Sequence, residues 1–175
     1  MTDTFYKTNG TVGTSILFWA KDAKGYTTNL NKAHVYTRKE AQSEIDDGVP
    51  REQYKGSSKY KEFFIKTDDV DRLLTYRVDE QHVDNKDLYP NTKSNERQYV
   101  AYIKDKWDGN DLFFARTVIG TSPDLYWVRV FHQVHIEQHA DCFKDMNILP
   151  LEKCKELERP TFQVENLNKV ECLGN

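Results

Sequence analysis

The longest uninterrupted apolar stretch in the chain, Ile16-Leu17-Phe18-Trp19-Ala20, has only five residues. A run of this length is too short for a helix that spans a bilayer, and it matches one buried strand. Short aromatic or β-branched runs recur along the chain, with turn-forming Gly, Asp and Asn residues between them. The pattern predicts small sheets built from short strands, in a protein that does not enter a membrane.

The composition is that of a folded chain with a polar surface. Of 175 residues, 38% are hydrophobic and 30% are charged, and ten Tyr and nine Phe far outnumber two Met. Aromatic side chains favour strands over a helical bundle. The net charge of −3 gives no general basic field for nucleic acid. Three cysteines without a regular spacing, and an N-terminus without an apolar targeting segment, predict reduced thiols and a cytoplasmic location.

Local signals predict the elements of the first half. Residues 15–20 and 63–66 are predicted strands. Thr37 and Glu40 have the spacing of a capping box, in which the threonine hydroxyl and the glutamate carboxylate each accept from a backbone N–H. A helix over residues 38–46 is therefore predicted, ending before a glycine and a proline.

Two polar segments interrupt the predicted elements, and strand signals resume in the second half of the chain. Residues 49–62 are polar and lysine-rich, which predicts a loop excursion, and residues 79–97 read as a linker. Asp108-Gly109-Asn110 lies between two strand-like runs and predicts a hairpin. A further strand is predicted over residues 125–134 because this stretch is aromatic and β-branched.

These elements predict an α+β fold of small antiparallel sheets, each packed by one or two short helices. The predicted domains are a first α+β module at residues 1–78, the linker at 79–97, and a β-hairpin with a second, diverged module at 98–175. A faint internal repeat supports this division, with residues 30–45 aligned to residues 143–158. Chance similarity is the alternative, because few residues are identical.

One stretch of the first module resembles a small module common in uncharacterised bacteriophage proteins. That module has an aromatic strand ending in Trp, then Gly-Tyr-Thr-Thr-Asp-Leu, an alanine, Tyr-Ser/Thr and Glu-Glu-Ala. The matching residues are Trp19, Gly25, Tyr26, Thr27, Thr28, Leu30, Ala33, Tyr36, Thr37, Glu40 and Ala41. The repeat alignment puts Gln138-His139-Ala140 at the Gly-Tyr-Thr position of the second module. The resemblance implies a phage accessory protein in the host cytoplasm, and it brings no known catalytic residues.

Three histidines and a cysteine form the densest group of metal-binding residue types. His132, His135, His139 and Cys142 follow one another at intervals of three, four and three. On a helix all four would share one face, a geometry able to hold Zn²⁺. On a strand His132 would point away from His135 and His139. The β-branched context favours the strand, so no cofactor is expected and zinc is the alternative.

Two tyrosine-rich segments are the predicted partner-binding residues. Aromatic side chains beside Lys or Arg commonly anchor protein interfaces. The residues are Tyr26 and Tyr36 in the phage-like stretch, and Tyr54, Lys55, Lys59, Tyr60 and Lys61 in the excursion. The same excursion could contact RNA or DNA.

Patterns for catalysis are weak. Asp68, Asp69 and Asp71 could bind Mg²⁺, but acids at a helix start complement the helix dipole and need no other role. The sequence has no GxSxG nucleophile elbow, P-loop or dinucleotide fingerprint. The predicted function is therefore non-enzymatic binding of a host protein, as an inhibitor of a defence system of the CRISPR or restriction type. A nucleic-acid-binding module with or without zinc is the alternative, and a hydrolase using His and Asp within residues 132–145 comes third.

Overall fold

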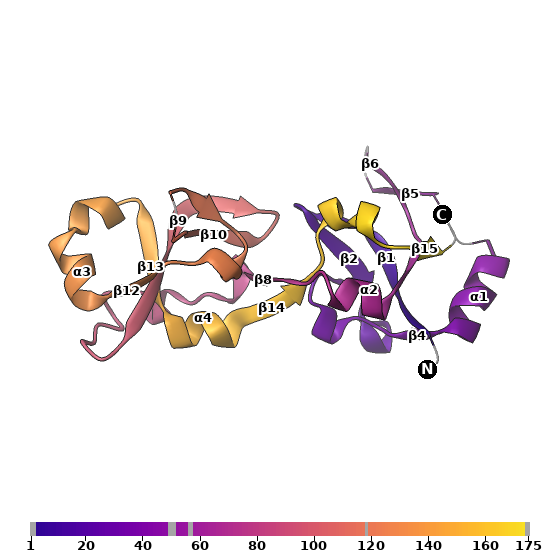
Figure 1. Cartoon of the computed structure of the whole chain (residues 1–175), viewed down its shortest axis with the longest axis horizontal. Coiled ribbons are helices and arrows are strands. Elements are labelled where there is room, and N and C mark those ends of the chain that lie inside the picture. The colour runs from indigo at the N-terminus through magenta and orange to yellow at the C-terminus, as the bar shows by residue number, and fades with distance from the viewer. Residues whose placement is uncertain (1–2, 49–51, 56–57, 118, 174–175) are drawn as a thin grey trace. The chain divides into compact units, whose positions relative to one another are not determined.

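The computed structural model describes most of the chain, namely residues 3–48, 52–55, 58–117 and 119–173. The chain forms two compact units, which Figure 1 shows with their elements labelled. Unit 1 consists of residues 1–75 and 160–175, and unit 2 consists of residues 76–159. Both units combine antiparallel strands with short helices, so the α+β prediction is confirmed.

Unit 1 is built around a long strand, β1 (Thr4–Val12). Its sheet has six strands in the order β15-β7-β1-β2-β3, and β4 also pairs with β1. β1 turns into β2 at Gly13, whose φ of +57° favours glycine. The other strands and helices of unit 1 are β2 (Ser15–Trp19), β3 (Tyr26–Thr27), β4 (Tyr36–Thr37), α1 (Arg38–Asp46), β5 (Glu52–Lys55), β6 (Ser58–Lys61), β7 (Phe64–Lys66), α2 (Thr67–Asp71) and β15 (Cys172–Leu173).

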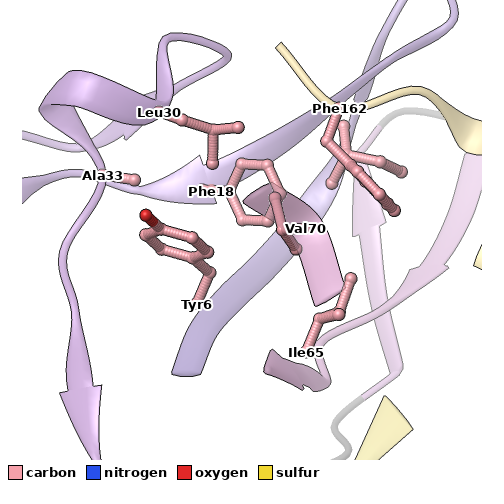
Figure 2. Packing of buried hydrophobic residues seen from close by; sticks show 8 residues of the cluster. Tyr6, Phe18, Leu30, Ala33, Ile65, Val70 and Phe162 are labelled. Carbon is pink, nitrogen blue, oxygen red and sulfur yellow. The ribbon is translucent and has the colours of Figure 1, made fainter. Parts of the chain in front are cut away.

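The two faces of this sheet bury different apolar clusters. Neighbouring residues of a strand point to opposite faces. Phe64 therefore packs with Phe5 and with Ala41 of α1, while Ile65 joins a cluster on the other face. Figure 2 shows this second cluster, in which Phe162 from the C-terminal segment lies beside the other core side chains. The end of the chain thus completes the core of unit 1.

The predicted start and length of α1 are confirmed. Thr37 Oγ1 accepts from the backbone N–H of Glu40 at 3.3 Å, and Thr37 N–H donates to Glu40 Oε2 at 2.7 Å. The helix covers the predicted residues 38–46, and Gly48 follows it with a φ of +102°. The predicted strands around Phe18 and Phe64 are also present, as β2 and β7.

Unit 2 has a similar sheet around a second long strand, β9 (Gln98–Asp108). Four of its five strands have the order β11-β10-β9-β12, and the fifth, β13, also pairs with β9. The predicted hairpin at Gly109, which has a φ of +67°, joins β9 to β10. The other strands and helices are β10 (Asp111–Ala115), β11 (Thr121–Ser122), β12 (Val130–His132), α3 (Gln133–Gln138), β13 (Met146–Pro150) and α4 (Leu151–Leu157).

Two predicted segments have a different structure. The predicted strand over residues 125–134 is present only at β12 (Val130–His132): a 3₁₀ turn, η5 (Leu125–Trp127), precedes it, and α3 begins at Gln133. Asp124 caps the turn by accepting from the N–H of Tyr126 at 3.0 Å, a local bond that competes with an extended backbone. The predicted loop at residues 49–62 contains an antiparallel hairpin of β5 and β6.

The division into units also differs from the predicted domains. Residues 79–97 were predicted to be a linker, but Val83 and Leu88 pack against a buried cluster of unit 2. Residues 160–175 belong to unit 1 and not to a C-terminal module. The strands β8 (Thr75–Val78) and β14 (Glu158–Thr161), which pair with each other, contain the two points where the chain passes between units. Among the described residues, no helix combines the length and the apolar character needed to cross a membrane.

Candidate binding surface on unit 2

Unit 2 exposes a group of large apolar side chains close together along the chain. Ile119 is fully exposed, Tyr126 is 78% exposed and Trp127 is 46% exposed. The η5 turn presents the two rings, because Leu125 packs against the core while the next two residues face solvent. Tyr126 and Trp127 meet edge to face, with ring centroids 4.7 Å apart. Exposed aromatic rings of this kind are typical anchors of binding surfaces.

Two arginines flank the exposed rings. Arg116 and Val128 form an isolated antiparallel β-bridge, and the N–H of Arg129 donates to the carbonyl of Ala115 at 2.8 Å. Both arginines therefore lie on neighbouring backbone segments. Arg116 Cζ lies 5.9 Å from the ring centroid of Trp127. Within the part of the chain that the structure describes, neither arginine has an ion pair with a carboxylate.

We call this group, Arg116, Ile119, Tyr126, Trp127 and Arg129, the aromatic–arginine surface. A guanidinium group stacked on a ring keeps its N–H groups available at the edge of its plane. Arg129 Cζ likewise lies 5.2 Å from the ring centroid of Phe131. The surface therefore offers apolar area together with donors for a negatively charged group.

A hollow of about 310 Å³ adjoins the two arginines. Its lining includes Arg116, Arg129 and Phe131, with His135 and Phe143 from the following segment. The volume is at the lower limit for a small-molecule site. No Asp or Glu belongs to the described lining, which contains two arginines, two histidines and Cys142.

The structure separates the four predicted zinc ligands. His135 and His139 are one helical turn apart, with ring centroids 4.6 Å from each other, and they line the 310 Å³ hollow with Cys142. His132 instead lines a second hollow, of about 870 Å³, together with Arg97. Among the described residues, no group of three or more His, Cys, Asp or Glu side chains is arranged to hold a metal ion.

The predicted partner-binding residues lie on unit 1. Tyr26 is 48% exposed, and its ring meets the edge of Trp19 at 4.9 Å between centroids. Tyr36 packs edge to face on Phe64, and burial, followed by the charge of nearby Glu44, raises its pKa to about 12. Tyr36 is therefore a packing residue as well as a surface one. Tyr54, Lys55, Lys59, Tyr60 and Lys61 lie on the β5–β6 hairpin, and their side chains fall outside the described part.

The acidic residues at α2 have the structural position predicted for them. Asp68 and Asp69 occupy the first turn of the helix, where they complement its dipole. Burial raises the pKa of Asp71, and the charge of Asp68 raises it further. The helix ends at Asp71, and the hydroxyl of Thr67 forms a hydrogen bond with that of Thr4 at 2.7 Å.

Comparisons of the chain with protein-family models, curated proteins and solved structures find no match. The assignment of a site therefore rests on the geometry of the chain itself. Sequence reasoning did not single out Tyr126 and Trp127, because an aromatic stretch beside valines resembles a buried strand. The signal that could have found them is Ser122-Pro-Asp124, a turn with a capping aspartate before the two rings.

Proposed function

We propose that the chain acts by binding a partner protein, and that the aromatic–arginine surface of unit 2 is its contact surface. The observation that supports this proposal is the exposure of Tyr126 and Trp127 beside two arginines that lack carboxylate partners in the described chain. Tyr, Trp and Arg are the residue types that contribute most to the free energy of protein association.

The chemistry of this surface indicates which groups a partner protein would present to it. Burial of the two rings requires an apolar patch on the other protein. Arg116 and Arg129 would be desolvated in the same contact, which is favourable only if carboxylates or other anionic groups meet them. The expected partner therefore presents acidic side chains around an apolar centre.

The resemblance of residues 15–41 to bacteriophage modules gives this partner a biological context. It favours a phage accessory protein in the cytoplasm of its host. The partner would then be a host protein, and inhibition of a CRISPR or restriction system is the role proposed. The hollow beside the surface favours binding over hydrolysis, because its described lining contains His139 and Cys142 but no carboxylate to orient the histidine.

A nucleic acid is the second candidate partner, and Trp127 is the observation that favours it. A tryptophan ring next to arginines can stack on an unpaired base while the guanidinium groups contact phosphates. Such binding would weaken steeply as salt concentration rises. Affinity for single-stranded DNA or RNA that falls with salt, and that is lost in Trp127→Ala, would favour this candidate over a protein.

Affinity capture from host lysate with matched variants tests the main proposal. Wild type, Trp127→Ala, Arg116→Gln and Tyr26→Ala are compared at equal concentration, with nuclease treatment to remove nucleic acid. Tyr26→Ala is the matched control because it removes a similarly exposed ring from unit 1. A partner retained by wild type and Tyr26→Ala should bind Trp127→Ala about 30-fold less tightly, the loss expected for a central aromatic contact worth about 2 kcal/mol.

The contradicting results are equally definite. Equal retention by Trp127→Ala and wild type would exclude the aromatic–arginine surface. Loss of the partner from Tyr26→Ala alone would favour the surface predicted from the sequence. Failure of the wild-type chain to retain any protein would count against a protein-binding function.

A further inference from the structure

Units 1 and 2 repeat one scheme of strand pairing. In each unit, a buried aromatic residue of the central strand pairs with two residues that occupy equivalent places in the chain. One partner is an aromatic residue just before the first helix, and the other is the residue that precedes the second helix. The three residues are Phe5, Tyr36 and Lys66 in unit 1, and Tyr99, Phe131 and Pro150 in unit 2.

The connecting turns repeat the same hydrogen bonds. Asn29 in unit 1 accepts from the backbone N–H two residues later at 3.0 Å, and Asp124 in unit 2 does the same at 3.0 Å. The N–H of each of these residues is bonded to a hydroxyl two residues earlier, that of Thr27 at 3.0 Å or of Ser122 at 3.1 Å. Residues 25–37 thus match residues 120–132, which differs from the alignment predicted from the sequence.

The segments that follow α2 and α4 are exchanged between the units. Tail 1, residues 75–89, follows α2 of unit 1, yet its Asp79 bridges to Asp111 of unit 2. Tail 2, residues 159–173, follows α4 of unit 2, yet its Gln163 bridges to Ser15 of unit 1. The two tails correspond along their length. Glu80 N–H donates to Asn110 O and Val164 N–H to Thr14 O, both at 2.9 Å, while Val78 and Phe162 are both fully buried.

Unit 2 surrounds its incoming tail with buried charges. Arg77 of tail 1 lies 2.8 Å from Asp108 and 3.1 Å from Asp111. Arg159, the first residue of tail 2, pairs with Asp111 and lies 3.4 Å from Asp79. Asp111 is 1% exposed and both arginines are also buried, so the centre of this ionic cluster is held away from water.

Unit 1 has a neutral cluster at the matching positions. Gln163 of tail 2 donates from its amide nitrogen to Thr161 Oγ1 at 2.8 Å and to Thr75 Oγ1 at 2.9 Å, with Ser15 Oγ at 3.3 Å. The bridges and strand registers define the matching pairs. These are Arg77 with Thr161, Asp79 with Gln163, Asp108 with Val12, Asp111 with Ser15, and Arg159 with Thr75.

We infer that the units are two copies of one module that have exchanged their tails, and that the two clusters direct each tail to the unit of the opposite type. An unexchanged tail 1 would bury Arg77 beside the hydroxyl of Ser15, without a carboxylate. An unexchanged tail 2 would bring Thr161 and Gln163 to Asp111, and one buried arginine would be missing there. A buried charge without its partner is strongly unfavourable, so the mismatched pairings are disfavoured.

A chain with two neutral clusters tests this inference. The five residues of the ionic cluster are replaced by their counterparts from unit 1, as Arg77→Thr, Asp79→Gln, Asp108→Val, Asp111→Ser and Arg159→Thr. The tails then lose their preference for one type of unit, so each tail can pair with either unit. After refolding from urea, part of the converted chain should hold each tail on its own unit, a pairing that the wild-type chain excludes.

Cysteine pairs report which tail each unit holds. Directly opposed residues of antiparallel strands have Cα atoms about 4.5–5.5 Å apart, which a disulfide can bridge. Thr14→Cys with Val164→Cys should oxidise within the wild-type chain, and Thr14→Cys with Glu80→Cys should not. In the neutral chain the second pair should also oxidise.

The reciprocal conversion of unit 1 is the second variant. It carries Val12→Asp, Ser15→Asp, Thr75→Arg, Thr161→Arg and Gln163→Asp, and it should lose the pairing preference in the same way. Converted chains that refold with the wild-type disulfide pattern would overturn the inference. Failure of both converted chains to fold would also overturn it, because equivalent positions should accept each other's residues.

Discussion

Replacing Phe162 by alanine should destabilise unit 1, although this residue follows the last helix of unit 2. Phe162 is fully buried in the cluster that contains Ile16, Phe18 and Val70. Loss of a buried phenylalanine ring costs about 3–5 kcal/mol, because the transfer free energy and the cavity left behind add together. If unit 1 opens by itself, 3 kcal/mol corresponds to an acceleration of amide exchange of about 150-fold.

Hydrogen exchange followed by mass spectrometry locates this effect. Peptides from β1 and β2 should exchange faster in Phe162→Ala, while peptides from β9 and β13 should keep the wild-type rate. Val78→Ala is the reciprocal control, since Val78 belongs to tail 1 and is buried in unit 2. Faster exchange of β9 and β13 in Phe162→Ala, with β1 and β2 unchanged, would refute the assignment of tail 2 to unit 1.

Three further outcomes follow from local contacts. Thr37→Ala removes the capping box and should lower the free energy of unfolding by about 1 kcal/mol in urea titrations. Burial raises the pKa values of Cys154 and Tyr36 to about 12 in the folded chain, against 9.0 and 10.0 ordinarily. Both groups are protonated at neutral pH in the folded and the unfolded chain. Stability measured in urea should fall as the pH rises from 9 towards 12, because the unfolded chain loses these protons first. Cys142 is exposed and Cys154 buried, so iodoacetamide should label Cys142 in the native chain and Cys154 only after unfolding; equal labelling would contradict the fold.

Elements with complete local signals could be predicted from the sequence. The helix α1 has a capping box at its start and a glycine after its end, so its limits depend on neighbouring residues alone. The β9–β10 hairpin likewise depends on one glycine between two strands. The fold class followed from such short elements without any knowledge of how they pair.

The exchange of tails and the binding surface depend on contacts that the sequence does not display. Arg77 and Asp111 are separated by 34 positions along the chain, and no local pattern links them. Sequence reasoning therefore assigned residues 79–97 to a linker and the last residues to the second module. Tyr126 and Trp127 resemble strand residues, and only the capped η5 turn places both rings in solvent.

The most direct test of the binding proposal is a hydrogen-exchange footprint of the chain in complex with the protein that it captures. The account predicts slower exchange at residues 116–131 of unit 2, with residues 26–36 and 52–61 of unit 1 unchanged. The same experiment on Trp127→Ala, at concentrations that restore partial binding, should show weaker protection of the same residues. Protection confined to unit 1, with residues 116–131 exchanging as in the free chain, would contradict the proposed contact surface.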